Sequence, residues 1–384
     1  MNIQTLYLRD FRNYETAQLA LSPGVNVFCG ENAQGKTNIL EAVGLLSTTR
    51  LFRSGQKRDA VRFGAQQAEV RAAFFAEKRD RTVRAVIPQA GRAQFFVNEV
   101  KQKRLSDVTG VLRTVLFCPE DLLLIREGAA ARRRFMDIAL CQLRPNYARY
   151  LSEYGKLHEN KLRILKDAEE KPSLLDALDD FSFRMSAIGG HIVRYRAYYL
   201  RALMEKAQGI HASLSGKNEQ LSYCYHTVSA VTDPFASAKE IGMQIWEHMC
   251  AHRAAEIASR SCLSGPHKDD LELLIGGRSA KNFGSQGQVR TCALSLKLAE
   301  RDMFYDSTKE YPILLLDDVL SELDAKRQDF VLNRIENGQV LIEEEIKQHP
   351  VMNELCPSSV NSIRIVTLRD KNGDVHYLYS LLRF

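Results

Sequence analysis

Paired cysteines are missing from this 384-residue chain, whose eight cysteines, at positions 29, 118, 141, 224, 250, 262, 292 and 356, include no C-x-x-C motif. Neither a zinc site nor a disulfide framework is indicated, and most of the thiols are expected to be small buried apolar groups. Apolar runs of about 18 residues, the length that a membrane span needs, are missing too. The chain opens with a strand pattern and not a signal peptide, so we expect a cytoplasmic protein with no membrane partner.

Motifs that read a DNA sequence are also absent, because no helix-turn-helix, zinc-finger or RNP pattern occurs. The net charge of +6 is unevenly placed, since residues 51–150 hold 20 Lys and Arg against 10 Asp and Glu. Such a region is typical of a protein that binds the phosphate backbone of DNA without sequence specificity, although a solvated face with no ligand is the alternative. The candidate contacts are Arg50, Arg53, Lys57, Arg58, Arg62, Lys101, Lys103, Arg104 and Arg113, and the leading four are Arg53, Lys57, Arg58 and Lys103.

A complete G-x-x-x-x-G-K-[ST] motif is present, formed by Gly30, Glu31, Asn32, Ala33, Gln34, Gly35, Lys36 and Thr37. It lies between an expected strand at 24–29 and an amphipathic helical pattern at 39–46. In a phosphate loop the helix N-terminus attracts the phosphates, Lys36 reaches the β- and γ-phosphates, and Thr37 offers its hydroxyl to Mg²⁺. The motif predicts a nucleotide site, and a Gly-rich turn entering a helix is the alternative.

Two carboxylates end an apolar run at 311–316, which is expected to be a buried parallel strand that delivers them to its carboxyl edge. Asp317 would hold Mg²⁺, directly or through water, and Asp318 would polarise the attacking water. Asp324 then closes an S-x-L-D motif of the kind that follows this strand in ABC-type ATPases. A strand that runs into an Asx turn is the alternative for the two acids.

A Ser-x-Gly-Gln motif begins a long helical pattern of Ala293, Leu294, Leu296, Leu298 and Ala299. Its residues Ser285, Gly287 and Gln288 supply a hydroxyl and N–H groups suited to a γ-phosphate. An ordinary helix N-cap at Ser285 is the alternative. The order and spacing of all these motifs favour an ABC-type ATPase that binds ATP and Mg²⁺.

Residues 1 to about 340 resemble the RecF family, in the SMC-like branch of ABC ATPases, and the resemblance extends beyond the nucleotide motifs. Its motifs are FRNY at 11–14, PEDL at 119–122, RRRFMD at 132–137 and GPHKDDL at 265–271. Lys268 replaces the family's arginine in the last motif. Glu127 and Ala129 stand where the family usually has Gly and Pro, which would loosen that turn.

The resemblance implies an α/β fold, with an ABC-type P-loop NTPase head of mixed sheet and flanking helices and an inserted, mainly helical second domain. We expect the head at 1–105 and 262–341, the insertion at 106–261 and an atypical tail at 342–384. Glycines at 189–190, and the loop around Gly216, are expected to break the helical pattern of the insertion.

In the fold that the sequence resembles, the signature serine faces away from its own phosphate loop, so Ser285 would act on ATP bound to a second copy. The resemblance thus implies an ATP-dependent homodimer that clamps double-stranded or gapped DNA and is released by slow hydrolysis. It implies recombinational repair of single-strand gaps, replication-fork maintenance and the SOS response to DNA damage, with RecR and indirectly RecO as partners. ATPase activity would be weak, stimulated by DNA and used as a switch.

Two alternative functions remain. A nucleotide-binding subunit of an ABC transporter shares the motifs, but transporters keep them much closer together than the 249 residues between Lys36 and Ser285. A defective fusion product with little turnover is the second alternative.

Residues 343–384 do not follow the RecF pattern. The stretch 348–367 resembles sugar-transfer-associated ATP-grasp enzymes, yet no other part of that fold is present, so no ATP-grasp activity is expected. A family-specific tail and a spliced reading frame are both open, and we favour the spliced frame. Glu343, Glu344 and Glu345 stand where RecF-like chains are expected to place hydroxyl residues. Carboxylates near a triphosphate would weaken ATP-driven dimerisation and slow hydrolysis.

Overall fold

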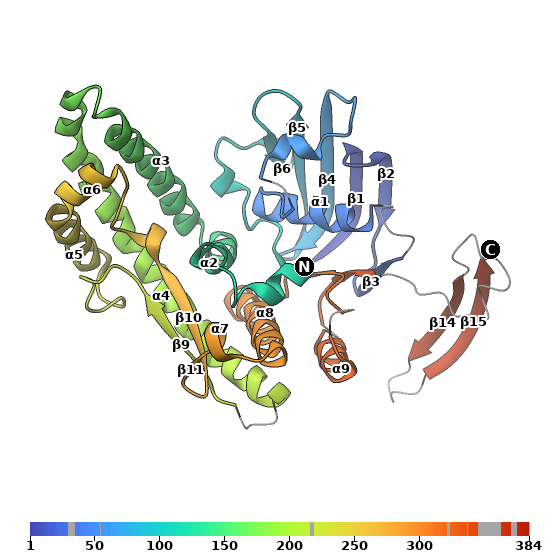
Figure 1. Cartoon of the computed structure of the whole chain (residues 1–384). Coiled ribbons are helices and arrows are strands. Elements are labelled where there is room, and N and C mark those ends of the chain that lie inside the picture. Colours follow the sequence, from blue (N-terminus) through green and yellow to red (C-terminus); the bar gives the residue numbers. More distant parts are fainter. Residues whose placement is uncertain are drawn as a thin grey trace.

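The computed structural model describes residues 1–29, 35–53, 55–215, 219–320, 323–335, 337–344, 362–369 and 375–383. Figure 1 shows a head built on two sheets and, beside it, an insertion of long helices. Helix α1 (Lys36–Thr48) packs in the head between the two sheets, because its apolar side chains share one core with residues of both.

The first sheet of the head is antiparallel and has the order β2-β1-β4-β5-β6-β7. Alternating buried and exposed positions along β1 and β4 give the sheet one apolar face, which lies against α1. Its strands are β1 (Asn2–Phe11), β2 (Tyr14–Ala20), β4 (Gln67–Ala76), β5 (Arg79–Pro88), β6 (Gln94–Val97) and β7 (Val100–Lys101).

The second sheet is parallel and has the order β3-β13-β12-β8. Its strands are β3 (Val25–Cys29), β8 (Thr114–Phe117), β12 (Ile313–Asp317) and β13 (Val340–Glu344). β12 is buried along its whole length, as a central parallel strand should be. The strand expected at 311–316 is therefore present, but it begins at Ile313 and ends at Asp317.

β12 and β13 separate two hydrophobic cores. Ile313, Leu315 and Leu341 belong to the core around α1 and the antiparallel sheet. Their chain neighbours Leu314 and Leu316 belong to the core on the other face, which includes α8 (Gln286–Thr308). This alternation, with a period of two residues, sets which later residues of these strands face α1.

The insertion is mainly helical. Its longer helices are α2 (Ala129–Leu143), α3 (Pro145–Asp167), α4 (Leu178–Ser215), α5 (Ala238–Ala251) and α6 (Arg253–Ser259). The sheet β11-β10-β9 packs with them, and it is formed by β9 (Leu221–His226), β10 (Asp270–Ile275) and β11 (Arg278–Ser279). The other described helices of the chain are α7 (Ala280–Phe283) and α9 (Ala325–Arg334). The described 3₁₀ turns of the whole chain are Lys57–Ala60, Leu105–Asp107, Pro119–Leu123, Pro172–Ala177 and Pro266–Lys268.

The helix break that we expected at 189–190 is wrong, because α4 continues through both glycines as a 38-residue helix. The glycines serve a close helix crossing. A Cβ atom on Gly190 would lie 2.1 Å from the carbonyl oxygen of Ala238, at the start of α5. α4 does end at Ser215, next to Gly216, which lies outside the described residues.

The division into head, insertion and tail stays a prediction. One strand from within 106–261 joins the head, since β8 pairs in parallel with β12. At the other end of the chain, β14 (Ser362–Arg369) and β15 (Val375–Arg383) pair only with each other among the described strands. Within the described residues, no helix is long and apolar enough to cross a bilayer.

The crossing of α4 and α5 yields a stability prediction. Gly190→Ala should lower the free energy of unfolding by about 1–3 kcal/mol, because the new methyl group overlaps a backbone carbonyl that cannot rotate away. Gly209→Ala is the matched control on the same helix, where an added Cβ atom meets nothing within 4 Å. It should raise stability by about 0.5–1 kcal/mol through helix propensity. Urea denaturation followed by circular dichroism measures both, and equal effects would contradict the crossing.

Candidate functional site

The phosphate-loop motif lies between β3 and the N-terminus of α1, as expected. Gly30, Glu31, Asn32, Ala33 and Gln34 lie outside the described residues, and Gly35, Lys36 and Thr37 lie within them. Gly35 is the N-cap of α1 and has a φ of 97°, a conformation that favours glycine. Lys36 and Thr37 form the first turn and are buried. Their position at a helix N-terminus suits the binding of phosphate.

The FRNY turn between β1 and β2 holds the end of this loop. The Tyr14 hydroxyl donates to the carbonyl oxygen of Gly35 at 3.2 Å. The Asn13 side chain packs so closely that a Cβ atom on Gly35 would lie 2.4 Å from it. Asn13 also accepts a hydrogen bond from Asn38 at 2.9 Å. The sequence motif alone did not indicate that this turn contributes to the site. The structure places the turn beside the end of the phosphate loop, where it supports Gly35.

A buried ion pair fixes the same turn on α1. The guanidinium of Arg12 donates to both carboxylate oxygens of Glu41, at 2.8 and 3.0 Å. Glu41 is fully buried, so removal of Arg12 would leave a buried acid without its ion-pair partner. A third donor to Glu41 is the backbone N–H of Arg53, at 3.3 Å. Glu41 therefore connects the FRNY turn, α1 and the segment that carries Arg53.

Side chains from three elements meet at the carboxyl edge of the parallel sheet. In the register of β12 and β13, Asp317 lies opposite Glu343. Both residues follow the alternation that places Ile313, Leu315 and Leu341 on the α1 face. The Thr37 hydroxyl donates to the Glu343 carboxylate, and it lies close enough to Asp317 to lower the pKa of that carboxyl. The structure thus brings together Thr37 and Asp317, the two predicted metal ligands.

The environment of Asp317 is suited to a carboxyl group that binds a cation. Burial and the neighbouring Glu343 carboxylate raise the pKa of Asp317 to about 7, and the positive charge of Arg53 acts in the opposite direction. Its Oδ1 atom is buried and has no hydrogen-bond partner. The described residues contain no group of three His, Cys, Asp or Glu arranged to hold a metal. Hydroxyl, water and phosphate oxygens would have to complete the shell, and Mg²⁺ suits such a set of oxygen ligands.

Asp318 leaves the direction of the strand. It is exposed and has a φ of 50°, which is uncommon for a residue with a side chain. Backbone conformations of this kind cluster at functional sites, where surrounding structure maintains them. The predicted role of Asp318 in polarising water stays a prediction.

The signature residues begin α8 with a capping box. The backbone N–H of Gln288 donates to the Ser285 hydroxyl at 3.2 Å, and the backbone N–H of Ser285 donates to the Gln288 side chain at 2.8 Å. Ser285 is therefore an N-cap, but it is also exposed. Its hydroxyl hydrogen can still be donated to another group. The Gln288 amide donates to Glu219 at 2.7 Å, a contact that sequence reasoning missed.

Arg327 links the S-x-L-D segment to the signature. Asp324 caps α9 and forms an ion pair with Arg327, whose guanidinium donates to the carbonyl oxygen of Gly287 at 3.1 Å. The same guanidinium also reaches the Thr291 hydroxyl at 2.7 Å. Ser321 and Glu322 lie outside the described residues. Asp324 is thus linked to the signature helix through the side chain of Arg327. The sequence motif did not indicate this link.

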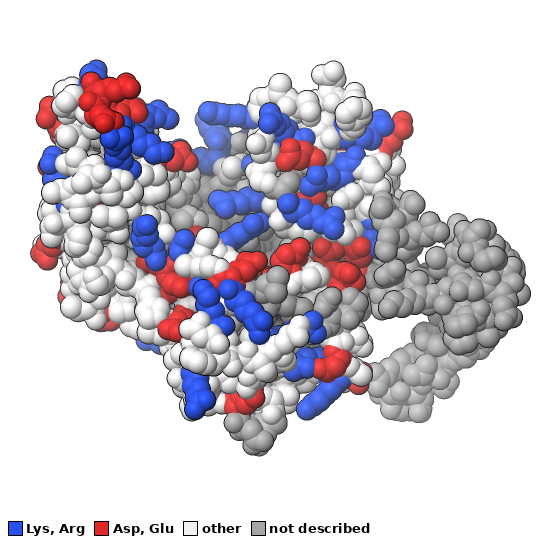
Figure 2. Space-filling model, in the orientation of Figure 1, with Lys and Arg blue, Asp and Glu red and all other residues white. Residues whose placement is uncertain are grey.

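The candidate DNA-binding residues are not equivalent. Figure 2 shows Lys and Arg side chains on the head and along the edge of the insertion that faces it. Arg53, Arg58 and Lys103 are exposed. Lys57 is half-buried over the ring of Phe95, and burial together with Arg50 lowers its pKa. Because the charge of Arg53 acts on Asp317, this residue lies beside the nucleotide site.

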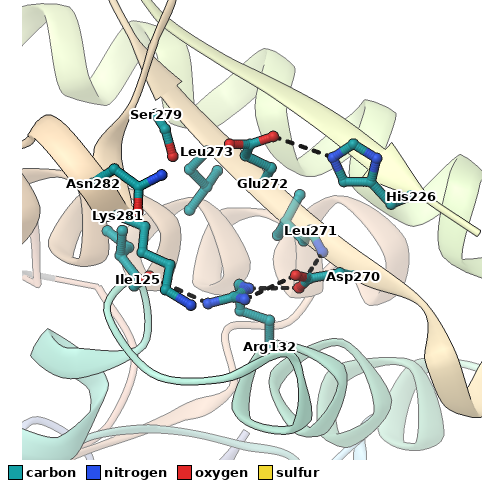
Figure 3. Close-up of a pocket in the computed structure, with 10 residues that line it drawn as sticks. All are labelled: Ile125, Arg132, His226, Asp270, Leu271, Glu272, Leu273, Ser279, Lys281 and Asn282. Atoms are coloured by element: carbon teal, nitrogen blue, oxygen red, sulfur yellow. Dashed lines mark hydrogen bonds and ion pairs between the residues drawn. The ribbon is translucent and has the colours of Figure 1, made fainter.

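A pocket of about 270 Å³ lies on β10, next to the signature segment. Figure 3 shows that four of the side chains that line it form two pairs, since Arg132 contacts Asp270 and His226 contacts Glu272. Arg132 is buried and donates to both oxygens of Asp270, at 2.6 and 2.9 Å. These residues come from the RRRFMD and GPHKDDL motifs and join α2 to β10. We interpret the pair as a structural link between the two elements.

The fold and the arrangement of motifs define an ABC-type P-loop NTPase head with flanking helices and mixed sheets. The SMC head bound to the C-winged helix domain of ScpA has the same fold, with 16% identity, a TM-score of 0.50 and coverage of 99% of this chain and 97% of that one. A structure of the recombination mediator RecF with ATP is more similar, with 30% identity, a TM-score of 0.85 and coverage of 98% and 97%. The structure of RecF-ATPrS gives the same identity and TM-score, with 98% coverage of both chains.

The sequence comparisons agree with the fold. The model of the RecF/RecN/SMC N terminal domain matches residues 2–344. The DNA replication and repair protein RecF of Bacillus subtilis is 39% identical over 340 residues, which are 88% of this chain and 90% of that protein. The RecF protein of Lactobacillus johnsonii is 37% identical over 336 residues, or 87% and 90%. The chain therefore belongs to the RecF family.

Lys36 gives the most direct test of the site. Lys36→Ala should abolish ATP binding or hydrolysis, because the cation that offsets the triphosphate charge is removed. Lys36→Arg should retain some binding and lose turnover, since a planar guanidinium replaces a compact ammonium poorly. Equilibrium binding of a fluorescent ATP analogue and phosphate release measure the two steps. Unchanged affinity in Lys36→Ala would refute the assignment of the phosphate loop.

Proposed function

We propose that this chain is an ATP-dependent DNA-binding clamp that acts in recombinational repair of single-strand gaps and in replication-fork maintenance. The observation that carries the proposal is the convergence of Thr37 and Asp317 at the sheet edge beside the α1 N-terminus. The relatives support it, since they are DNA replication and repair proteins. The structural neighbours support it too, since they are RecF with ATP or ATPrS in the RecFOR pathway.

The residues of the site fit ATP and Mg²⁺. Lys36 and the first turn of α1 would bind the β- and γ-phosphates, and the Thr37 hydroxyl and the Asp317 carboxylate would hold Mg²⁺. The metal would neutralise charge on the phosphates. Asp318, at the end of β12, would orient and polarise the attacking water. ATPase activity would be weak, stimulated by DNA and used as a switch.

The signature would act across a homodimer. Ser285 is exposed at the start of α8, and its hydroxyl accepts from Gln288 while keeping a hydrogen to donate. Together with Gly287 and Gln288 it would contact the γ-phosphate bound to a second copy. Two chains would then be held together by shared nucleotide, and hydrolysis would remove the group that bridges them. The Asp324–Arg327–Gly287 contacts would couple the segment after β12 to this interface.

The proposed partners are DNA, on the basis of exposed basic side chains, and RecR and RecO, on the basis of family membership. Exposed Arg53, Arg58 and Lys103, with half-buried Lys57, would contact the backbone of double-stranded or gapped DNA without sequence specificity. The place of the structural neighbours in the RecFOR pathway supports RecR and, indirectly, RecO as protein partners. The comparisons do not favour a transporter subunit.

Two substitutions should have opposite effects on dimerisation. Ser285→Arg should keep ATP binding to the monomer and abolish the ATP-induced dimer, because the serine acts in trans. Asp318→Asn should trap the ATP-bound dimer, because it removes the acid that polarises water and leaves Asp317 in place. Sedimentation velocity with and without ATP measures both outcomes.

Ser237→Arg is the matched control for Ser285→Arg. Ser237 is an exposed N-cap of α5 and accepts from Glu240 at 3.2 Å, so its replacement removes the same kind of cap far from the signature. The loss of either cap should cost about 1 kcal/mol. Only the Ser285 variant should lose the dimer, and a Ser285→Arg protein that still dimerises with ATP would refute the two-headed mechanism.

DNA binding should fall steeply with salt and vary little with sequence. Alanine substitutions at Arg53, Arg58 and Lys103 should lower the slope of log K against log salt by up to about 0.9 for each duplex phosphate that the variant no longer neutralises. Lys57 should contribute less, because it is half-buried against Phe95. The exposed insertion residues Lys166, Lys171 and Lys239 provide a charge-matched triple control. Fluorescence anisotropy over a salt series measures the slope, and a slope near zero for the native chain would contradict backbone binding.

A further inference from the structure

We propose that Glu343 completes a divalent-cation site with Thr37 and Asp317, and that this site binds its cation before any nucleotide arrives. The inference rests on the proposed nucleotide site, because it shares two residues with it. It goes further in assigning a metal-binding role to Glu343 and in stating that the cation can bind before ATP.

The geometry directs three oxygen-bearing side chains to one point. β13 pairs with β12 so that Glu343 lies opposite Asp317, on the face of the sheet that packs against α1. Thr37 stands in the first turn of α1 and contacts both carboxylates. The backbone cannot easily change this arrangement, because β13 is held by β3 on its other side, where Glu343 lies opposite Phe28.

A buried oxygen atom of Asp317 that has no hydrogen-bond partner indicates a ligand at this point. Asp317 is 6% exposed, and its Oδ1 atom is buried without a hydrogen bond. Such an acceptor is costly unless a cation or donor reaches it. A second carboxylate, from Glu343, adds negative charge at the same point. Arg53 is one cation that acts on Asp317, and its exposed side chain belongs to a loop and not to the sheet edge.

The chemistry selects a hard divalent cation. Two carboxylates and a hydroxyl are oxygen donors, which suit Mg²⁺ or Mn²⁺, and water would fill the remaining positions. In the absence of Glu343, Thr37 and Asp317 would offer one carboxylate, and the phosphates would be needed to retain the metal. With Glu343, the protein itself supplies two carboxyl groups. Their negative charge should disfavour ATP that arrives without metal, so cation and nucleotide should bind with strong mutual dependence.

Mn²⁺ binding to the full chain without nucleotide tests the inference. The loss of the free Mn²⁺ signal in electron paramagnetic resonance should reveal a bound ion that Mg²⁺ displaces. Loss of outer partners of a metal site alone often weakens binding by about 10–100-fold, so Glu343→Gln should weaken Mn²⁺ binding by about tenfold or more. Glu240→Gln, at an exposed position of α5, is the charge-matched control and should leave Mn²⁺ binding unchanged.

Two further measurements keep the test decisive. Thr37→Val removes a donor from α1 without altering β13, so it should also weaken Mn²⁺ binding even if Glu343→Gln does not fold. In EDTA, a fluorescent ATP analogue should bind about tenfold more tightly to Glu343→Gln than to the native chain, a difference of about 1.4 kcal/mol. Native protein that binds no Mn²⁺ without nucleotide, or Glu343→Gln that binds it equally well, would overturn the inference.

The outcome can be separated from that of the proposed function. If the native chain binds Mg²⁺-ATP but no Mn²⁺ alone, the cation site is wrong and the nucleotide site stands. If the native chain binds Mn²⁺ alone but no Mg²⁺-ATP, the cation site stands and the proposed clamp fails.

Discussion

The burial of β12 between two hydrophobic cores is the constraint on which the head depends. Ile313 and Leu315 face α1, and Leu314 and Leu316 face the core that includes α8. Full burial of each such side chain stabilises the fold by about 1.5–3 kcal/mol. A slip of one residue would exchange the two faces of the strand and move Asp317 away from Thr37. The packing of apolar side chains therefore fixes the position of the acid.

The charged groups around this strand hold the surrounding segments in place. Arg12 and Glu41 connect the FRNY turn to α1, and Arg327 connects Asp324 to the start of α8. Arg196 on α4 is buried and donates to Asp269, at 2.7 Å, which joins the insertion to the GPHKDDL motif. Each pair connects residues far apart in the chain or on different elements. Most family motifs outside the nucleotide loop thus supply one or both residues of such a contact.

Sequence reasoning reached the parts of the site that depend on local patterns. It identified the loop before α1, the buried strand that ends at Asp317 and the helix that begins at Ser285, because each has a short-range signal in periodicity or capping. It expected Glu343 near the triphosphate, but it could not pair this residue with Thr37 and Asp317, because the register of β12 and β13 joins strands separated by a helix. It was wrong about 189–190, because glycine that permits a helix crossing has the same local appearance as glycine that ends a helix.

The register of β12 and β13 holds the carboxylates of Asp317 and Glu343 next to each other. Asp317 and Glu343 lie on the two central strands of a four-stranded sheet, with β8 and β3 hydrogen-bonded on the outer sides. Moving the strands apart would break the ladder between them and strain both outer pairs, so the backbone cannot relieve the repulsion. The side chains cannot turn to the opposite face either, because leucine, isoleucine and valine fill it. A positive group that enters from the α1 side would relieve it, and a phosphate-bound metal would also come from that side.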